Sequence, residues 1–190
     1  MKLLKDKIIA EGVAKGTEIV KVDRFLNHQV DPFLLKEIGK EFYDRFKNEN
    51  ITKILTIESS GIAIAAVVAL EFGVPFVFAK KYSSRNLDND VYQADVYSFT
   101  KCTTSTIRVS KNYINADDRV LIIDDFLANG CALKGLIDVI KQGGAEVCGC
   151  GIVIEKSYQP GAGEIKKMGY RVESLARIKS VKDGNIEFVD

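Results

Sequence analysis

Two adjacent acidic residues, Asp124 and Asp125, directly follow the aliphatic run 120–123 and precede a turn of small residues. Such a continuous aliphatic run is typical of a parallel strand that is covered on both faces of its sheet. Ligands of open α/β sheets bind just beyond the carboxyl ends of these strands. Two neighbouring carboxylates at that place can accept hydrogen bonds from adjacent hydroxyl groups of a sugar. Asp124 and Asp125 are therefore the leading candidates for a binding or catalytic role.

The turn that follows the two acids is suited to binding an anion. It consists of Ala128, Asn129, Gly130, Cys131 and Ala132, and it opens a predicted helix over 130–141. Free backbone N–H groups and the helix dipole favour a phosphate at such a helix N-terminus. The alternative is that the acids only cap the helix, but a cap needs one acid and no turn of small residues. The order of acids and then amides predicts a sugar-phosphate site.

A second candidate anion site comprises Ser59, Ser60 and Gly61, at the end of the predicted strand 53–57. Its amides and hydroxyl groups lie where the predicted helix 62–72 begins, so they can also cradle a phosphate. A simple capped helix start, with Gly61 relieving crowding, is the alternative. Two such loops at neighbouring strand ends favour a ligand with phosphates at both ends of a sugar.

The acid pair and its turn resemble the phosphoribosyl-pyrophosphate (PRPP) signature of the type I phosphoribosyltransferases. The resemblance covers nearly the whole chain and is closest to the bacterial members that act on xanthine. The matching segments are 22–29, 56–62, 97–100, 124–130, 152–157 and 169–177. The resemblance implies an α/β type I phosphoribosyltransferase fold, with a parallel twisted sheet flanked by helices, a small hood and a flexible lid loop. It also implies a single domain over 1–190, in which 1–50 and 155–190 contribute the base-binding hood.

The same resemblance implies an activity, namely transfer of the 5-phosphoribosyl group of PRPP to N9 of xanthine. The products are xanthosine 5′-monophosphate (XMP) and pyrophosphate, and the implied role is purine salvage. The implied site residues are Asp124 and Asp125 for the ribose hydroxyls, Ala128 to Ala132 for the 5′-phosphate, Ser59, Ser60 and Gly61 for pyrophosphate, and Val20, Asn27 and Lys156 for xanthine. Mg²⁺ is implied as an ion carried by PRPP, without a metal site of the protein's own.

The residue types at these positions suit that ligand, with two departures from the family pattern. Lys156 and Asn27 can donate hydrogen bonds to the two carbonyl groups of xanthine, although a surface lysine and a turn residue are the alternatives. Most family members have threonines in the phosphate turn, where this chain has Ala128 and Cys131. More of the grip on phosphate must therefore come from backbone amides. Val20 stands where Leu is common, which is a conservative change.

Composition predicts one globular domain without a large nucleic-acid or membrane surface. The chain has 190 residues, of which 46% are hydrophobic, and this is enough to bury one good core. Lys plus Arg total 27 against 26 Asp plus Glu, and the net charge of +1 argues against nucleic-acid binding. No stretch approaches the roughly 20 apolar residues of a membrane span, and the N-terminus lacks the apolar core of a secretion signal. We therefore expect a cytoplasmic protein.

The cysteines do not form a metal-binding pattern. Four cysteines, Cys102, Cys131, Cys148 and Cys150, accompany a single histidine, which falls short of a zinc ligand set. Cys148 and Cys150 are predicted to be small apolar residues on one face of a strand. Cys131 lies at a helix N-terminus, where a thiol can become reactive, but a small residue tolerated in a tight turn is the alternative.

The predicted helices and strands alternate, as expected of a parallel sheet with right-handed crossovers. The expected helices are 2–11, 32–46, 62–72 and 130–141, the expected strands are 18–25, 53–57, 75–79, 120–123 and 145–155, and 170–178 pairs with 184–189 as a hairpin. We expect Leu3, Leu4, Ile8 and Ile9 to face inward and the wholly apolar helix 62–72 to be buried. The polar segment 82–112 is predicted to be a long flexible loop or ribbon outside the core that acts as a lid.

Three questions stay open at this level. A hypoxanthine or guanine phosphoribosyltransferase differs in the groups facing base position 2, and the sequence does not settle that choice. PRPP-sensing regulators reuse this fold to bind DNA or RNA, but they need an added reader domain or a basic face. A homodimer is implied by the family, and the basic pair Lys80 and Lys81 is predicted either to reach pyrophosphate, across the dimer interface, or to be ordinary surface charge.

Overall fold

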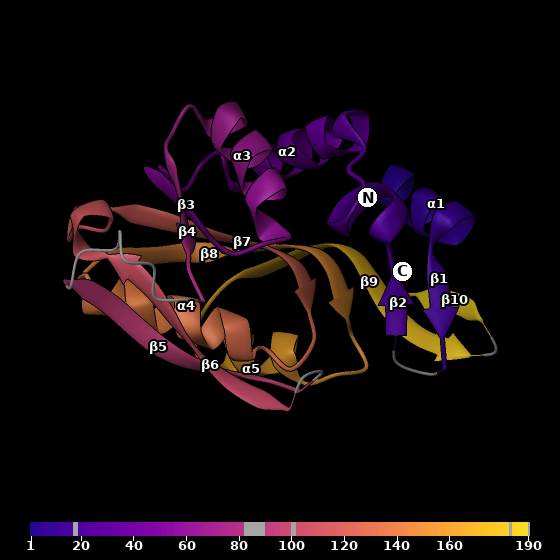
Figure 1. The fold of residues 1–190 in the computed structure, drawn as a ribbon. Coiled ribbons are helices and arrows are strands. Elements are labelled where there is room, and N and C mark those ends of the chain that lie inside the picture. Colours follow the sequence, from indigo (N-terminus) through magenta and orange to yellow (C-terminus); the bar gives the residue numbers. More distant parts are fainter. Residues whose placement is uncertain (17–18, 82–89, 100–101, 183, 190) are drawn as a thin grey trace.

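The core of the computed structural model is a six-stranded mixed sheet with the order β10-β9-β8-β7-β3-β4 (Figure 1). The model describes residues 1–190 except 17–18, 82–89, 100–101, 183 and 190. The strands of this sheet are β3 (Lys53–Ile57), β4 (Phe76–Ala79), β7 (Arg119–Leu127), β8 (Glu146–Lys156), β9 (Val172–Lys182) and β10 (Asn185–Phe188). Strands β4, β3, β7, β8 and β9 pair in parallel, whereas β10 pairs antiparallel to β9. The predicted α/β fold with a mostly parallel sheet is confirmed.

Helices cover both faces of the sheet (Figure 1). On one face lie α2 (Pro32–Phe46) and α3 (Gly61–Phe72), and on the other lie α4 (Cys131–Gln142) and α5 (Gly161–Lys167). Strand β7 contributes to both cores because successive side chains of a strand point to opposite faces. Leu121 and Ile123 belong to the cluster beneath α2 and α3, whereas Val120 and Ile122 belong to the cluster around α4. This two-sided burial explains the continuous aliphatic run in the sequence.

Helix α2 begins as the sequence predicts. The Asp31 carboxylate accepts hydrogen bonds from the backbone N–H groups of Phe33, at 3.0 Å, and Leu34, at 3.2 Å. Pro32 occupies the first helical position, where its missing N–H is no loss. Helix α3 ends at Gly73, which has a left-handed φ of 67°. Local sequence signals thus fix the start of α2 and the end of α3.

Two predictions about buried helix faces are wrong. In α1 (Lys2–Glu11), Leu4 and Ile8 are buried as predicted, but Leu3 is 50% exposed and Ile9 is 65% exposed. Residues four apart share a helix face, and α1 meets the rest of the protein through that one face. Helix α3 has no polar face, yet Leu70 is 78% exposed near its end. Apolar composition alone therefore overestimates how much of α3 the neighbouring elements cover.

The predicted strand over 18–25 is also wrong in its length. The structure has a short hairpin of β1 (Val13–Lys15) and β2 (Ile19–Lys21), followed by a π-helical turn, η1 (Asp23–Asn27). Residues 17–18 of the predicted strand lie outside the described part of the chain. Phe25 and Leu26 are adjacent in sequence and both are buried in the same core cluster, which a helical turn permits and a strand does not.

The segment predicted as a loop or ribbon contains an antiparallel ribbon of β5 (Val91–Ser98) and β6 (Thr103–Ser110), followed by a 3₁₀ turn, η2 (Lys111–Tyr113). The prediction that this segment stays outside the core is wrong. Ala94, Ile107 and Val109 are buried in the cluster around α4. A Cβ added to Gly135 of α4 would lie 2.6 Å from Val96 Cγ2, so the ribbon packs closely on the helix. Parts of the predicted flexible lid, 82–89 and 100–101, lie outside the described residues.

A β-bulge overturns the prediction that Cys148 and Cys150 share one face of β8. The pairing of β8 with β7 shifts by one residue between Val120 and Leu121. Such a bulge places two consecutive residues opposite one and resets the alternation of side chains. Cys148 therefore packs on the α2 and α3 side, whereas Cys150 packs on the α4 side. Burial raises the pKa of the Cys148 thiol to about 11 and that of Cys150 to about 12.

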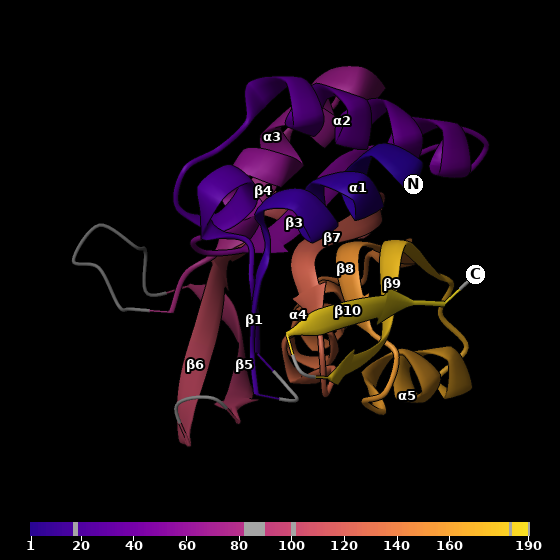
Figure 2. The ribbon, with the colours of Figure 1, turned by 90° about the vertical axis from the view of Figure 1, so that its right-hand side faces the viewer.

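The two ends of the chain lie side by side next to β9 and β10 (Figure 2). The N-terminal amino group of Met1 donates a hydrogen bond to the Leu175 carbonyl oxygen at 2.5 Å. Lys5 Nζ donates to the Val189 carbonyl oxygen at 3.0 Å and lies 5.4 Å from the centre of the Phe188 ring. These contacts join two of the segments that the family resemblance assigns to a hood, which itself stays a prediction.

The helices of the described residues include none with the length and apolar character that crossing a membrane requires.

Candidate functional site

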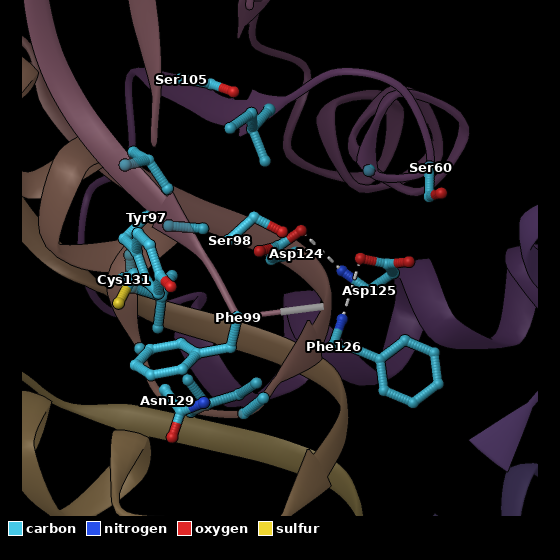
Figure 3. Close-up of a pocket in the computed structure, with 18 of the residues that line it drawn as sticks. Ser60, Tyr97, Ser98, Phe99, Ser105, Asp124, Asp125, Phe126, Asn129 and Cys131 are labelled. Carbon is cyan, nitrogen blue, oxygen red and sulfur yellow. Dashed lines mark hydrogen bonds between the residues drawn. The ribbon is translucent and has the colours of Figure 1, made fainter. Parts of the chain in front are cut away.

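A cavity of about 920 Å³ opens at the carboxyl ends of β3 and β7 (Figure 3). Its walls come from the ends of these strands, the first turns of α3 and α4, the β5–β6 ribbon and the end of β8. The lining residues are Ile19, 57–61, Lys81, 96–99, Ser105, Ile107, 124–133, Lys156 and Gln159. The cavity lies where ligands of open α/β sheets bind.

The structure brings most of the predicted site residues to this one cavity. The two acids, the turn 128–132, the loop 59–61 and Lys156 all line it. Val20 does not: it is 7% exposed and packs in the core, while the preceding Ile19 faces the cavity because side chains of β2 alternate. Asn27 does not line it either, although its side-chain oxygen is buried without a hydrogen-bond partner. The roles of Val20 and Asn27 stay predictions.

The two acids lie within β7, which continues through Leu127, and not after its end as the aliphatic run suggests. Asp124 is 4% exposed, and its Oδ1 accepts a hydrogen bond from the Asp125 backbone N–H at 3.0 Å (Figure 3). Asp125 Oδ1 accepts from the Phe126 backbone N–H at 2.9 Å. Burial, reinforced by the negative charge of Asp125, raises the pKa of Asp124 well above its ordinary value. The charge of Lys81 acts in the opposite direction.

The turn 128–132 leads directly into the N-terminus of α4. Gly130 adopts the left-handed φ of 80° directly before α4 begins at Cys131. The start of α5 supports the turn from below, since the Gly161 N–H donates a hydrogen bond to the Ala128 carbonyl oxygen at 3.0 Å. A Cβ on Gly161 would lie 2.3 Å from that oxygen and 2.7 Å from the Gly130 nitrogen. The turn therefore depends on a glycine 30 residues further along the chain, which the sequence analysis missed.

The loop 59–61 is as tightly packed as the turn. A Cβ on Gly61 would lie 2.0 Å from Thr56 Oγ1, so this position requires glycine. The peptide bond between Glu58 and Ser59 is cis. Glu58 Oε1 accepts a hydrogen bond from the backbone N–H of Lys81 at 2.5 Å, which ties the loop to the end of β4.

The two lysines that follow β4 differ in their positions. Lys81 lines the cavity, as the prediction of a pyrophosphate contact requires. Lys80 pairs through its backbone with Arg108 of β6, and its Nζ lies 5.9 Å from the centre of the Phe78 ring. A role at the site is therefore better supported for Lys81 than for Lys80.

Aromatic side chains also line the cavity, with Tyr97 and Phe99 on the side of the turn 128–132 (Figure 3). Tyr97 and Phe99 at the end of the ribbon form an edge-to-face pair with ring centroids 4.9 Å apart, and both face the cavity (Figure 3). Lys156 Nζ lies 6.0 Å from the centre of the Phe126 ring, so a cation and an aromatic ring stand together in the wall. An aromatic ring beside a charged donor is a suitable surface for a flat base that carries carbonyl groups.

The described residues contain no group of three or more His, Cys, Asp or Glu side chains arranged to hold a metal ion. The carboxylates that line the cavity, Glu58, Asp124 and Asp125, are nevertheless hard oxygen donors of the kind that Mg²⁺ prefers. Cys131 also lines the cavity, at the first position of α4.

Comparison with known proteins agrees with this geometry. Residues 22–188 match the model of the phosphoribosyl transferase domain. The chain is 57% identical to a xanthine phosphoribosyltransferase of Acinetobacter baumannii, over 100% of this chain and 99% of that protein. It is 56% identical to the xanthine phosphoribosyltransferase of Stutzerimonas stutzeri over the full length of both, and 56% identical to that of Limosilactobacillus reuteri.

Solved structures confirm the fold. The adenine phosphoribosyltransferase of Giardia lamblia, solved in complex with 9-deazaadenine, aligns with a TM-score of 0.78 over 92% of this chain and 97% of that chain, at 26% identity. The adenine phosphoribosyltransferase of Rhodothermus marinus aligns with a TM-score of 0.76 over 94% of this chain and 100% of that chain, at 23% identity. The cavity, the domain match and the full-length relatives lead to one conclusion: this chain belongs to the phosphoribosyltransferase family.

Proposed function

We propose that the protein is a xanthine phosphoribosyltransferase, which transfers the 5-phosphoribosyl group of PRPP to N9 of xanthine and releases XMP and pyrophosphate. The observation that carries this proposal is one cavity in which two carboxylates lie between two anion-binding loops, with Lys156 and an aromatic ring in the wall. The full-length relatives that carry this name support the choice of xanthine.

Asp124 and Asp125 would hold the 2′ and 3′ hydroxyls of the ribose. As the bond from C1′ to the pyrophosphate oxygen stretches, positive charge grows on the ribose ring. Two carboxylates anchored on the ring's hydroxyls stabilise that charge and hold C1′ in line with N9 of the base. The position of Asp124 beside a second acid is consistent with this role, because neighbouring sugar hydroxyls can donate hydrogen bonds to both carboxylates when PRPP binds.

The turn 128–132 would bind the 5′-phosphate. Alanine and cysteine stand where a hydroxyl residue would add hydrogen bonds, so the free N–H groups at the start of α4 provide most of the grip. The left-handed Gly130 and the supporting Gly161 keep those N–H groups pointing toward one place.

Ser59, Ser60 and Gly61 would bind pyrophosphate, with Lys81 adding a positive charge. Mg²⁺ fits this arrangement as an ion that enters with PRPP, and when bound it offsets charge on the leaving pyrophosphate. Glu58, Asp124 and Asp125 are the protein oxygens that stand closest to that role, because they line the same cavity.

The base would lie against Phe126, with Lys156 donating a hydrogen bond to one of its carbonyl oxygens. Asn27 and Val20 complete the base site in this proposal. The β5–β6 ribbon, which already carries Tyr97 and Phe99 to the cavity, would exclude water during transfer. A homodimer and a cytoplasmic location remain expectations from the family.

The test is to incubate the purified protein with PRPP, Mg²⁺ and xanthine, guanine, hypoxanthine or adenine in separate reactions, and to identify the nucleotide formed. We expect XMP and pyrophosphate in equal amounts, with the other bases used far less. Preferential formation of GMP or IMP would move the assignment to a guanine or hypoxanthine enzyme. Absence of any nucleotide product, with PRPP still bound, would contradict catalysis and favour a PRPP-binding regulator.

A further inference from the structure

Gln159 is a residue of the cavity wall to which no role has been assigned. It follows Lys156 by three positions, and its backbone N–H donates a hydrogen bond to the Lys156 carbonyl oxygen at 2.9 Å. This turn fixes the backbone positions of the two residues relative to each other. Its side-chain oxygen has essentially no solvent-accessible surface and no hydrogen-bond partner in the structure. Such an oxygen is costly to bury, so a ligand that supplies the missing donor is the simplest reason for its position.

The segment that carries Gln159 is rigidly joined to the phosphate turn. Two residues further on, the Gly161 N–H bonds the Ala128 carbonyl oxygen, and Gly161 Cα lies 3.2 Å from the place of a Cβ on Gly130. Gln159 therefore stands between Lys156, on the base side, and the turn 128–132, on the phosphate side. A purine can offer a ring N–H to the Gln159 oxygen once the side chain turns from its buried position into the cavity, whereas a phosphate presents no donor to an acceptor oxygen.

The chemistry of the proposed base requires an acceptor of this kind. Xanthine alternates carbonyl acceptors with ring N–H donors along its six-membered ring. Lys156 supplies a donor for a carbonyl, but it has no acceptor for a neighbouring N–H. Among the described residues that line the cavity, the side-chain amides are those of Asn129 and Gln159, and Asn129 lies in the phosphate turn. Gln159 is thus the neutral acceptor on the Lys156 side of the cavity.

We propose that Gln159 binds the base directly, its side-chain carbonyl oxygen accepting a hydrogen bond from a ring N–H of the purine whose carbonyl group Lys156 contacts. This inference rests on the proposed function and adds a specificity-determining residue to it. A base whose ring nitrogen at that place is an acceptor would leave the Gln159 oxygen unpaired and would bind more weakly.

The test compares Gln159→Leu, which removes the amide at similar size, with Gln159→Glu, which keeps an acceptor oxygen and loses the NH₂ donor. We expect Gln159→Leu to raise KM for xanthine roughly ten-fold, the usual scale for one lost hydrogen bond to a ligand, with KM for PRPP unchanged. Gln159→Glu should recover part of the loss for xanthine, while its added negative charge near the turn 128–132 should raise KM for PRPP. Gln93→Leu, at an exposed glutamine side chain on β5 outside the cavity, is the matched control and should leave both constants unchanged.

Each other outcome overturns the inference. A rise in KM for PRPP in Gln159→Leu would assign Gln159 to the phosphate. An unchanged KM for xanthine in Gln159→Leu would show that the side-chain oxygen makes no contact with the base. A fall in kcat or in thermal stability with both KM values unchanged would leave a structural role. Failure of the wild-type protein to form XMP would instead contradict the proposed function, so the two failures are distinguishable.

Discussion

Two carboxylates at the ends of neighbouring strands, Asp124 on β7 and Glu155 on β8, are equally buried and differently partnered. Each is 4% exposed. Glu155 accepts hydrogen bonds from Ser157 Oγ at 2.5 Å and Ser174 Oγ at 2.6 Å, and Arg177 Nε lies 3.4 Å from it. Asp124 accepts a backbone N–H at 3.0 Å and has a second negative charge beside it. Glu155 has a basic partner in Arg177, whereas the nearest charge to Asp124 is a second acid.

Their pKa values move in opposite directions. Burial alone favours the neutral acid in both cases. At Glu155 the hydrogen bonds from Ser157 and Ser174 and the charge of Arg177 outweigh burial, and the pKa is lowered. At Asp124 burial and the charge of Asp125 act together, and the pKa is raised. The difference separates an acid that joins β8 to β9 from an acid that is kept ready for a ligand, and it can be tested at both residues.

The largest expected effect is on catalysis, when Asp124 is changed. Asp124→Asn should lower kcat/KM by about 100-fold or more, because an amide keeps the shape but loses the charge that stabilises the ribose ring. Steady-state kinetics with PRPP and xanthine measure it, and Asp125→Asn should act in the same direction. Turnover close to that of the wild type would remove the electrostatic role of the pair.

Changes at Glu155 should affect the stability of the fold. Glu155→Gln should lower the free energy of unfolding by about 1 to 3 kcal/mol, because the amide cannot accept all the hydrogen bonds that the carboxylate receives. Urea unfolding followed by circular dichroism measures this change. Ser174→Ala, which removes one donor, is the graded control and should cost less. If Glu155→Gln cost no stability, the carboxylate would not be part of the scaffold.

The support of the phosphate turn should be sensitive to a single methyl group. Gly161→Ala places a Cβ 2.3 Å from the Ala128 carbonyl oxygen, so the turn must move. We expect a loss of about 1 to 3 kcal/mol in stability and a raised KM for PRPP. Gly163→Ala lies in the same helix with nothing within 4 Å of its added Cβ, and it should be neutral or slightly stabilising. Equal effects of the two changes would show that α5 does not support the turn.

A further expected effect is on the pH dependence of stability. Because the folded protein binds the Asp124 proton more tightly than the unfolded chain does, this contribution is full below the unfolded pKa of about 4. It is lost as the pH rises through the raised folded value, by at most about 1.4 kcal/mol per pH unit. Asp124→Asn should therefore gain in Tm over the wild type as the pH rises from 4 to 8. A constant Tm difference over that range would contradict the raised pKa.

Features that depend on neighbouring residues in the sequence could be predicted from it. The run 120–123 indicates a two-sided strand because every residue in it is aliphatic, and Asp31 with Pro32 marks a helix start because cap and φ are properties of the residues themselves. The acids and both anion loops could be predicted for the same reason. Each follows a recognisable strand within a few residues.

What the sequence could not supply depends on contacts between distant segments. Leu70 looks like a core residue in the sequence, but in the structure it is exposed because no neighbouring element covers it. The residues around it in the sequence give no sign of this. The bulge that separates Cys148 from Cys150 arises from pairing with β7. Gly161 supports a turn formed much earlier in the chain. The distant partners of Glu155, Ser174 and Arg177, likewise come from tertiary packing, which explains why two buried acids look alike in sequence.

The most direct measurement is a crystal structure of the protein with PRPP and Mg²⁺. We expect the ribose 2′ and 3′ hydroxyls on Asp124 and Asp125, the 5′-phosphate in the turn 128–132 and the pyrophosphate against residues 59–61. Carboxylates turned away from the sugar, with the turn 128–132 empty, would contradict the division of roles on which this account rests.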